Sequence, residues 1–349
     1  MKFKKLLPML LALSFLLTLT VSAADPDVEI MATGRDEKKL LLCPGGMPVG
    51  VRLTQDGVTV VGMAEFKADG KTVCPASDAG IKSGDLITRI NGRDVSTSED
   101  VTKRVEACKG EGISVSVRRD GKDFNLSVFP AQDTDGNYRI GVWVKDNTSG
   151  IGTVTYITPE GNDFGGLGHG ICDQETGSVV EFRKGVIFDV TVSGVIKGKS
   201  GLPGQIKGFF GSDRLGLLSA NTDCGIFGVL SGTPSEAGKP VEIIKKDKLK
   251  EGKAEILCTL GDDGVQKYEV EISQINTSED GNKCFVVKVA DPKLIERTGG
   301  IVQGMSGSPI LQNGKLAGAI THVLVSDPTK GYGIFIENML NNAPTQKKK

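Results

Sequence analysis

The sequence predicts a mainly β protein of two folded modules that follow an N-terminal export segment. Three observations indicate this class. Glycine contributes 47 of the 349 residues and aromatic residues only 5%, a composition that favours turns and short strands over long helices. Apolar and polar residues alternate along much of the chain after residue 40. The chain is also long enough for two domains with separate cores.

The first 23 residues have the features of a secretory signal. Three lysines precede an apolar run from Leu6 to Val21, and Val21-Ser22-Ala23 fits a small-residue cleavage site. The run is short for a spanning helix, which needs about 20 apolar residues. We therefore expect residues 1–23 to be a signal peptide or a signal anchor, and the protein to be exported.

Charge and metal-ligand content exclude several function classes. The formal net charge is −1, so no basic field exists to hold nucleic acid. With two histidines and no H-E-x-x-H motif, a multi-histidine metal site is excluded, and we expect neither metal nor cofactor. The seven cysteines include no C-x-x-C pair, and we expect most of them to be free thiols.

Residues 40–130 form the first predicted module, of mixed α/β character. Two apolar stretches, 49–53 and 58–63, read as strands. Ser96 and Glu99 fit a capping box for a helix that ends at Gly110. Residues 113–128 alternate on both sides of Asp120-Gly121, which predicts a hairpin.

Residues 131–349 form the second predicted module, of short strands between glycines. Strands are expected within 151–157, 179–195, 256–260, 268–272 and 284–289, with a hairpin over 310–323 turned at Asn313-Gly314. Helical signal is confined to 335–340. A module of this kind favours a β-barrel or a β-sandwich.

The hexapeptide Gly304-Met305-Ser306-Gly307-Ser308-Pro309 is the strongest candidate for chemistry. Its glycines permit a sharp turn that exposes the Ser306 hydroxyl. Such a turn can direct the amides of Gly304 and Ser306 at one point, as an oxyanion hole for acyl transfer requires. An isolated G-x-S-G is more often an ordinary turn.

A serine nucleophile needs a base, and only His169 and His322 are available. An α/β-hydrolase needs an acid after the serine, and none lies between Ser306 and His322. The order His169, acid, Ser306 remains, with His322 as a reserve base or a residue that lines the cleft. The residues alone leave several acids open between His169 and Ser306, among them Asp173, Asp189, Asp223 and Asp291.

The string A-G-I-K-S-G-D-L-I-T-R-I-N-G at 79–92 resembles PDZ domains. This resemblance implies that an extended peptide adds to a strand edge beside a helix. The peptide terminus would be received by the glycine-rich loop Gly45-Gly46-Met47-Pro48-Val49-Gly50. The alternative is a PDZ fold that serves only as a spacer.

Residues 291–310, Thr321-His322-Val323, Asp327-Pro328 and the segment L-G-H-G-I at 167–171 resemble the stage IV sporulation protein B peptidases. The resemblance covers essentially the whole exported chain and extends more distantly to chymotrypsin-like proteases. It implies a PDZ domain followed by a chymotrypsin-like double β-barrel. Ser306 would be the nucleophile, His169 the general base and Asp291 the orienting carboxylate, with Gly304 and Ser306 amides as the oxyanion hole.

The same resemblance implies a biological setting. Such peptidases act between the two forespore membranes, cleave themselves, and cleave the regulatory subunit of a membrane complex that holds an intramembrane metalloprotease, so signalling to the mother cell. Two alternatives remain. One is a non-catalytic PDZ scaffold that recruits membrane partners. The other is a periplasmic quality-control protease, although there the protease domain normally precedes the PDZ domain.

Overall fold

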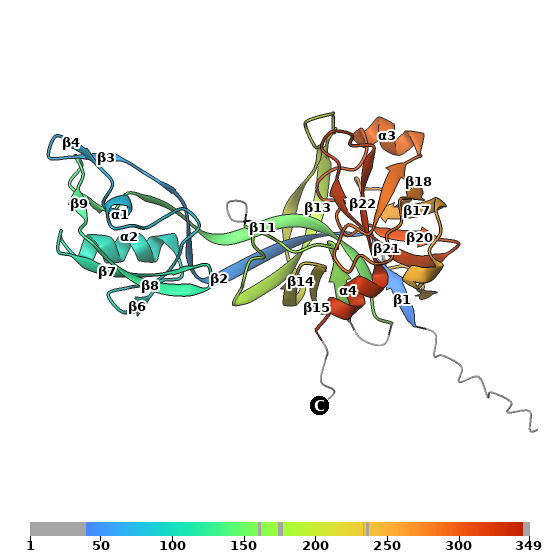
Figure 1. Cartoon of the computed structure of the whole chain (residues 1–349), viewed down its shortest axis with the longest axis horizontal. Helices are drawn as coiled ribbons and strands as arrows, with labels where there is room; N and C mark the ends of the chain where they lie inside the picture. Colours follow the sequence, from blue (N-terminus) through green and yellow to red (C-terminus); the bar gives the residue numbers. More distant parts are fainter. Residues whose placement is uncertain (1–39, 160–161, 174–176, 233, 235–236, 345–349) are drawn as a thin grey trace, which may run out of the picture. The chain divides into compact units, whose positions relative to one another are not determined.

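The computed structural model describes residues 40–159, 162–173, 177–232, 234 and 237–344. The expected export segment, residues 1–23, lies outside the described residues. Strands dominate those that are described, which confirms the mainly β class (Figure 1). Among the described helices, none has the length and apolar character to cross a membrane. The seven cysteines are all free thiols, as expected.

Six antiparallel strands close into a first barrel, because each pairs with the next and the last pairs with the first. Figure 1 shows two long partners, β2 and β11, running side by side. β1 (Leu41–Pro44) and β16 (Val241–Glu242) extend the sheet from β11. In order around the ring, the strands are β11 (Val142–Ile157), β12 (Asp163–Gly166), β15 (Gly225–Leu230), β14 (Gln205–Thr222), β13 (Lys184–Ile196) and β2 (Pro48–Met63).

A second closed barrel follows, so the predicted double β-barrel is confirmed. The rings of Phe285 and Phe335 pack in its core, with centroids 5.3 Å apart. The turn Asn313-Gly314 connects two of its strands as expected, with both residues at positive φ. The strands are β17 (Gly252–Cys258), β18 (Gln266–Ser273), β19 (Phe285–Val289), β22 (Lys330–Phe335), β21 (Lys315–Val323) and β20 (Pro309–Gln312). The helices are η1 (Lys246–Lys248), α3 (Pro292–Thr298) and α4 (Ile336–Asn342).

The PDZ module contains a sheet and one long helix that buries Val101 and Val105. This helix begins one residue later than expected: Thr97 rather than Ser96 is the N-cap, and it forms the capping box with Asp100. The elements are β3 (Phe66–Ala68), β4 (Lys71–Val73), α1 (Pro75–Asp78), β5 (Leu86–Ile90), β6 (Arg93–Asp94), α2 (Ser98–Ala107), β7 (Ile113–Arg119), β8 (Lys122–Val128), β9 (Ala131–Gln132) and β10 (Tyr138–Arg139).

One strand serves both modules, which the expected division into 40–130 and 131–349 does not describe. The first half of β2, residues 48–54, pairs with β11 and β13 in the first barrel. Its second half, residues 58–63, pairs with β5 and with the start of β11. Residues 41–54 therefore belong to the first barrel, because their apolar side chains are needed to complete its core.

Candidate active site

Ser306 lies in a tight turn immediately before β20, as its glycines predict. Gly304 and Gly307 adopt φ of +99° and +96°, which side chains rarely tolerate. A Cβ on Gly307 would lie 2.0 Å from the Thr153 carbonyl oxygen and 2.4 Å from the Leu167 amide nitrogen. The turn therefore packs directly against β11 and against the segment that leads to His169.

β11 holds the serine turn by three hydrogen bonds. The hydroxyls of Thr153 and Thr155 donate to the carbonyl oxygens of Gly304 and Gly307, each over 2.8 Å. The Thr153 amide donates to the Ser306 carbonyl oxygen over 2.9 Å. These bonds turn the carbonyls toward β11. Among the described residues, the amides of Gly304 and Ser306 have no acceptor, so both remain available for an oxyanion.

His169 follows β12 in a short segment with an unusual backbone. Leu167 and Gly168 both have positive φ, +63° and +68°. A Cβ on Gly168 would lie 2.9 Å from the Thr321 Cγ2, so this segment packs against β21. Asn221 secures the residues beyond it, since its amide donates to the carbonyls of Ile171 and Val180 and its oxygen accepts from the Ile171 amide.

The imidazole of His169 has a defined tautomer. Its Nδ1 lies 2.7 Å from the Gly170 carbonyl oxygen, and because a carbonyl can only accept, Nδ1 carries the proton. Nε2 is therefore left as the acceptor that a general base requires. The ring of His169 also contacts that of His322, with centroids 4.7 Å apart and the two planes tilted by 33°.

Ser306 and His169 converge on two adjacent residues of β21. The Ser306 hydroxyl donates to the Thr321 carbonyl oxygen over 2.6 Å, and the ring of His169 packs against that of His322, the next residue. The hydroxyl is thus bonded to a carbonyl rather than to the imidazole. Rotation of the O–H about the Cβ–Oγ bond would release the proton from Thr321, and catalytic hydrogen bonds often form fully only when substrate binds.

Both histidines titrate below their ordinary range. Burial lowers the pKa of His169, although its bond to Gly170 partly opposes this shift. Burial, then the nearby His169 and Lys283, lower the pKa of His322 to about 4. Both rings are therefore neutral at pH 7, the state in which His169 can accept a proton. His322 Nδ1 is buried and has no hydrogen-bond partner among the described residues.

The structure does not bring Asp291 to His169. Asp291 is the N-cap of α3, where its carboxylate accepts from the amides of Lys293 and Leu294. β19 separates it from the active site: Asn282, before this strand, accepts a hydrogen bond from Thr321, whereas Asp291 follows the strand. Five extended residues span about 15 Å. The sequence did not predict α3, and the assignment of Asp291 as orienting carboxylate stays a prediction.

The structure corrects the predicted position of the peptide-binding loop. Gly45, Gly46, Met47, Pro48, Val49 and Gly50 lie in the first barrel, not beside α2. The amides of Gly45 and Gly46 donate to β11 carbonyls, and Met47 and Val49 are buried in the barrel core. The loop carries the glycines that the motif needs, but the strand that follows it pairs within the barrel.

A groove of about 450 Å³ lies beside α2 instead, lined on its other side by residues 137–143. Ile140 and Gly141 line it, and within the described chain their amide nitrogens donate no hydrogen bond. Gly141 has a φ of +81°, and its Cβ would lie 2.5 Å from the Ala64 carbonyl oxygen. Trp143, the sole tryptophan, is 66% exposed on the groove wall.

Two β-barrels that present a G-x-S-G-x-P serine and a histidine to the same strand, preceded by a PDZ fold, define a serine peptidase with a PDZ module. The family models agree. The SpoIVB peptidase S55 model matches residues 136–340, more than half of the chain, and a PDZ domain model matches residues 45–129. The chain belongs to the SpoIVB peptidase S55 family.

Similarity to individual proteins is more limited. A zinc metalloprotease of Lactococcus lactis is 35% identical over 81 residues, 23% of this chain and 19% of the relative. A DegP-like periplasmic serine endoprotease of Brucella suis is 32% identical over 112 residues, 30% of this chain and 22% of the relative. The chain thus spans about a fifth of these relatives. The Rv3671c protease of Mycobacterium tuberculosis in its active form is 15% identical, with 57% of this chain and 76% of that chain covered and a TM-score of 0.31.

Proposed function

We propose that this protein is an exported serine endopeptidase in which Ser306 is the nucleophile and His169 the general base. The observation that carries the proposal is their convergence on Thr321 and His322, beside two amides that have no acceptor within the described part of the chain. The family resemblance predicts Asp291 as the third member of a catalytic triad with Ser306 and His169. In this structure His169 Nδ1 bonds to the Gly170 carbonyl oxygen.

The reaction follows from these positions. His169 Nε2 takes the Ser306 hydroxyl proton as the oxygen attacks a peptide carbonyl carbon. The amides of Gly304 and Ser306 donate to the resulting oxyanion, an interaction for which loss of one donor costs about 3 kcal/mol in such sites. The imidazolium then protonates the leaving amine, and water, activated by the same histidine, hydrolyses the acyl-enzyme.

Labelling with a fluorophosphonate tests the nucleophile. We expect wild type to form a covalent adduct at Ser306, and Ser306→Ala to form none while it stays folded. Ser308→Ala is the matched control, because Ser308 is fully buried two residues away and its hydroxyl has no partner among the described residues. Equal labelling of wild type and Ser306→Ala would reject the assignment.

For the setting, the proposal is cleavage of itself and of the regulatory subunit of a membrane-embedded pro-sigma-factor processing complex, in the space between the forespore membranes. Support comes from the S55 family membership and from the export signal of the sequence. Mass spectrometry of the purified full chain would detect self-cleavage and locate it. Trimming that persists in Ser306→Ala protein would assign the cut to another protease.

A second function, capture of a peptide C-terminus, is favoured by the groove beside α2. The amides of Ile140 and Gly141, which donate to no described residue, suit a terminal carboxylate, and the apolar side chains of α2 suit the side chains before it. If the chain were a non-catalytic scaffold, this would be its main activity.

Trp143 supplies the readout for this second function. We expect its emission to change on titration with acetyl-Ala-Ala-Val-Ala-Val that has a free carboxylate. The same peptide with a terminal amide is the control and should bind at least tenfold more weakly, because it lacks the charge that the amides would hold. Equal binding of both peptides would remove the carboxylate role.

A further inference from the structure

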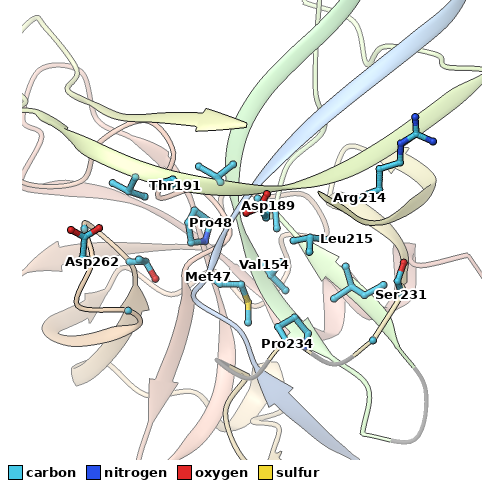
Figure 2. Close-up of a pocket in the computed structure, with 18 residues that line it drawn as sticks. Met47, Pro48, Val154, Asp189, Thr191, Arg214, Leu215, Ser231, Pro234 and Asp262 are labelled. Carbon is cyan, nitrogen blue, oxygen red and sulfur yellow. The ribbon is translucent and has the colours of Figure 1, made fainter. Parts of the chain in front are cut away.

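A cavity of about 610 Å³ opens on the first barrel (Figure 2). Its walls come from the β1–β2 connection, β2, β11, β13, β14, the end of β15 with the residues that follow it, and the β17–β18 loop. Met47, Pro48, Val154 and Leu215 provide apolar surface. Volume and lining are typical of sites that enclose a small group and orient it with a few polar atoms.

Asp189 is the polar residue of this cavity that could orient such a group. Figure 2 shows its carboxylate near the middle of the site, beside Pro48. Its Oδ1 is buried and has no hydrogen-bond partner among the described residues. Unpaired buried oxygens are rare in folded proteins, because removing them from water without a new partner is unfavourable. Oδ1 is covered by protein atoms and lies against Gly211, so the carboxylate has to turn toward the cavity before a ligand can donate to it and remove this penalty.

The backbone makes room for this carboxylate. Asp189 lies in an irregularity of the β13–β14 pairing, between Phe188, opposite Arg214, and Val190, opposite Phe210. A Cβ on Gly211 would lie 1.8 Å from Asp189 Oδ1, so the absence of a side chain at position 211 allows the carboxylate its place.

The charges of the lining favour a cation. Asp189 and Asp262 are its acids, and Arg214 is its one base among the described residues. Arg214 forms no ion pair with either acid within the described chain, and Figure 2 shows its guanidinium directed away from Asp189. A positive group in the cavity would therefore meet an attractive, partly desolvated carboxylate.

We propose that this cavity binds an ammonium or guanidinium group on an alkyl stem, with Asp189 as the acceptor and the apolar wall around the stem. A lysine or arginine side chain of a polypeptide has this chemistry. Val154 lines the cavity whereas Thr153 bonds to the serine turn, and adjacent side chains of a strand point to opposite faces. The cavity is thus an exosite for a basic residue outside the scissile bond, a role that rests on the proposed peptidase function.

Binding can be measured by NMR titration of Ser306→Ala protein, which removes cleavage from the experiment. We expect acetyl-Ala-Lys-Ala-amide to bind at least tenfold more tightly than the norleucine peptide of the same length. Asp189→Asn, which keeps the shape of the side chain, should abolish the difference. Asp262→Asn, at an exposed position on the rim, should change it less than threefold.

Thr191→Lys provides a second variant if Asp189→Asn does not fold. Thr191 is exposed, two residues from Asp189 on β13, so the new ammonium can reach the carboxylate and exclude the lysine peptide. Equal binding of the lysine and norleucine peptides to the parent protein would overturn the site. Cadaverine binding without lysine-peptide binding would overturn its role as a substrate exosite. Lysine-peptide binding by a protein whose wild type shows no fluorophosphonate labelling would uphold the site and reject the peptidase function.

Discussion

The Thr153 hydroxyl donates to the Gly304 carbonyl oxygen over 2.8 Å, although 151 residues separate them. Thr153 is 2% exposed, so its hydroxyl has little access to water as a substitute partner. The bond turns the Gly304 carbonyl toward β11 and leaves the amides of the turn directed elsewhere. One side chain of the first barrel thereby holds the turn that carries the proposed oxyanion site.

Thr153→Val tests this relationship. Valine keeps the volume and removes the hydroxyl, so the Gly304 carbonyl loses its buried donor. We expect an unfolding free energy about 1–3 kcal/mol lower. We also expect kcat to fall about tenfold with little change in KM, since a turn that relaxes aligns its amides less well. Thr59→Val, a buried threonine in the PDZ module, is the control and should leave kcat unchanged.

Gly307→Ala should separate the serine turn from the histidine segment. Its Cβ would lie 2.0 Å from the Thr153 carbonyl oxygen and 2.4 Å from the Leu167 amide nitrogen, so backbone must move. Gly314→Ala is matched to it, since Gly314 has φ of +75° but no atom within 4 Å of a Cβ. We expect Gly314→Ala to be destabilised only by the strain of an alanine at positive φ, about 1–2 kcal/mol in the free energy of unfolding.

Thermal melts and fluorophosphonate labelling of the two glycine variants provide the readouts. Gly307→Ala should melt well below Gly314→Ala and should label slowly or not at all, whereas Gly314→Ala should label like wild type. Equal melting and labelling of both variants would show that the close approach at Gly307 has no role.

Asp291→Asn separates the two roles of Asp291. Asparagine caps helices about as well as aspartate, so this variant should have the melting temperature of wild type. Asp291→Ala should lower the free energy of unfolding by about 1 kcal/mol, because it removes the cap. The triad assignment predicts at least a hundredfold lower kcat for Asp291→Asn, because an orienting carboxylate acts through its charge. If the Asn variant keeps wild-type activity, Asp291 has the capping role alone.

Stability should depend on pH through the two histidines whose rings are in contact. The pKa of His322 is about 4 in the folded protein and ordinarily 6.5, so the unfolded state binds more protons between these values. Stability should therefore fall as pH falls from 6.5 to 4. The pKa of His169 is also lowered and acts in the same direction. The melting temperature of His322→Gln should depend less on pH over this range than that of wild type.

Activity offers a separate check on His169. Because its pKa is lowered, the acid limb of kcat/KM should have its midpoint below pH 6.5. A midpoint above 6.5 would indicate a different base or a compensating negative charge near the ring.

Sequence alone determined the features whose physical cause is local. The hairpin at Asn313-Gly314 was predictable because both residues must take positive φ. The candidate nucleophile and base were predictable because a G-x-S-G turn and a choice of two histidines leave few alternatives. The double β-barrel and PDZ module followed from the family resemblance. The N-cap of helix α2 was predicted within one residue, whereas the helix ends at Ala107, before the expected Gly110.

Only the tertiary structure decided which distant residues meet. Thr153 and Asn221 carry no motif, and their partners lie 151 and 50 residues away. The glycine-rich loop at 45–50 has a composition suited to peptide binding, yet strand pairing places it in the first barrel and leaves residues 137–143 beside α2. Composition sets what a segment can do, whereas barrel closure, which buries the most apolar surface, determines its neighbours.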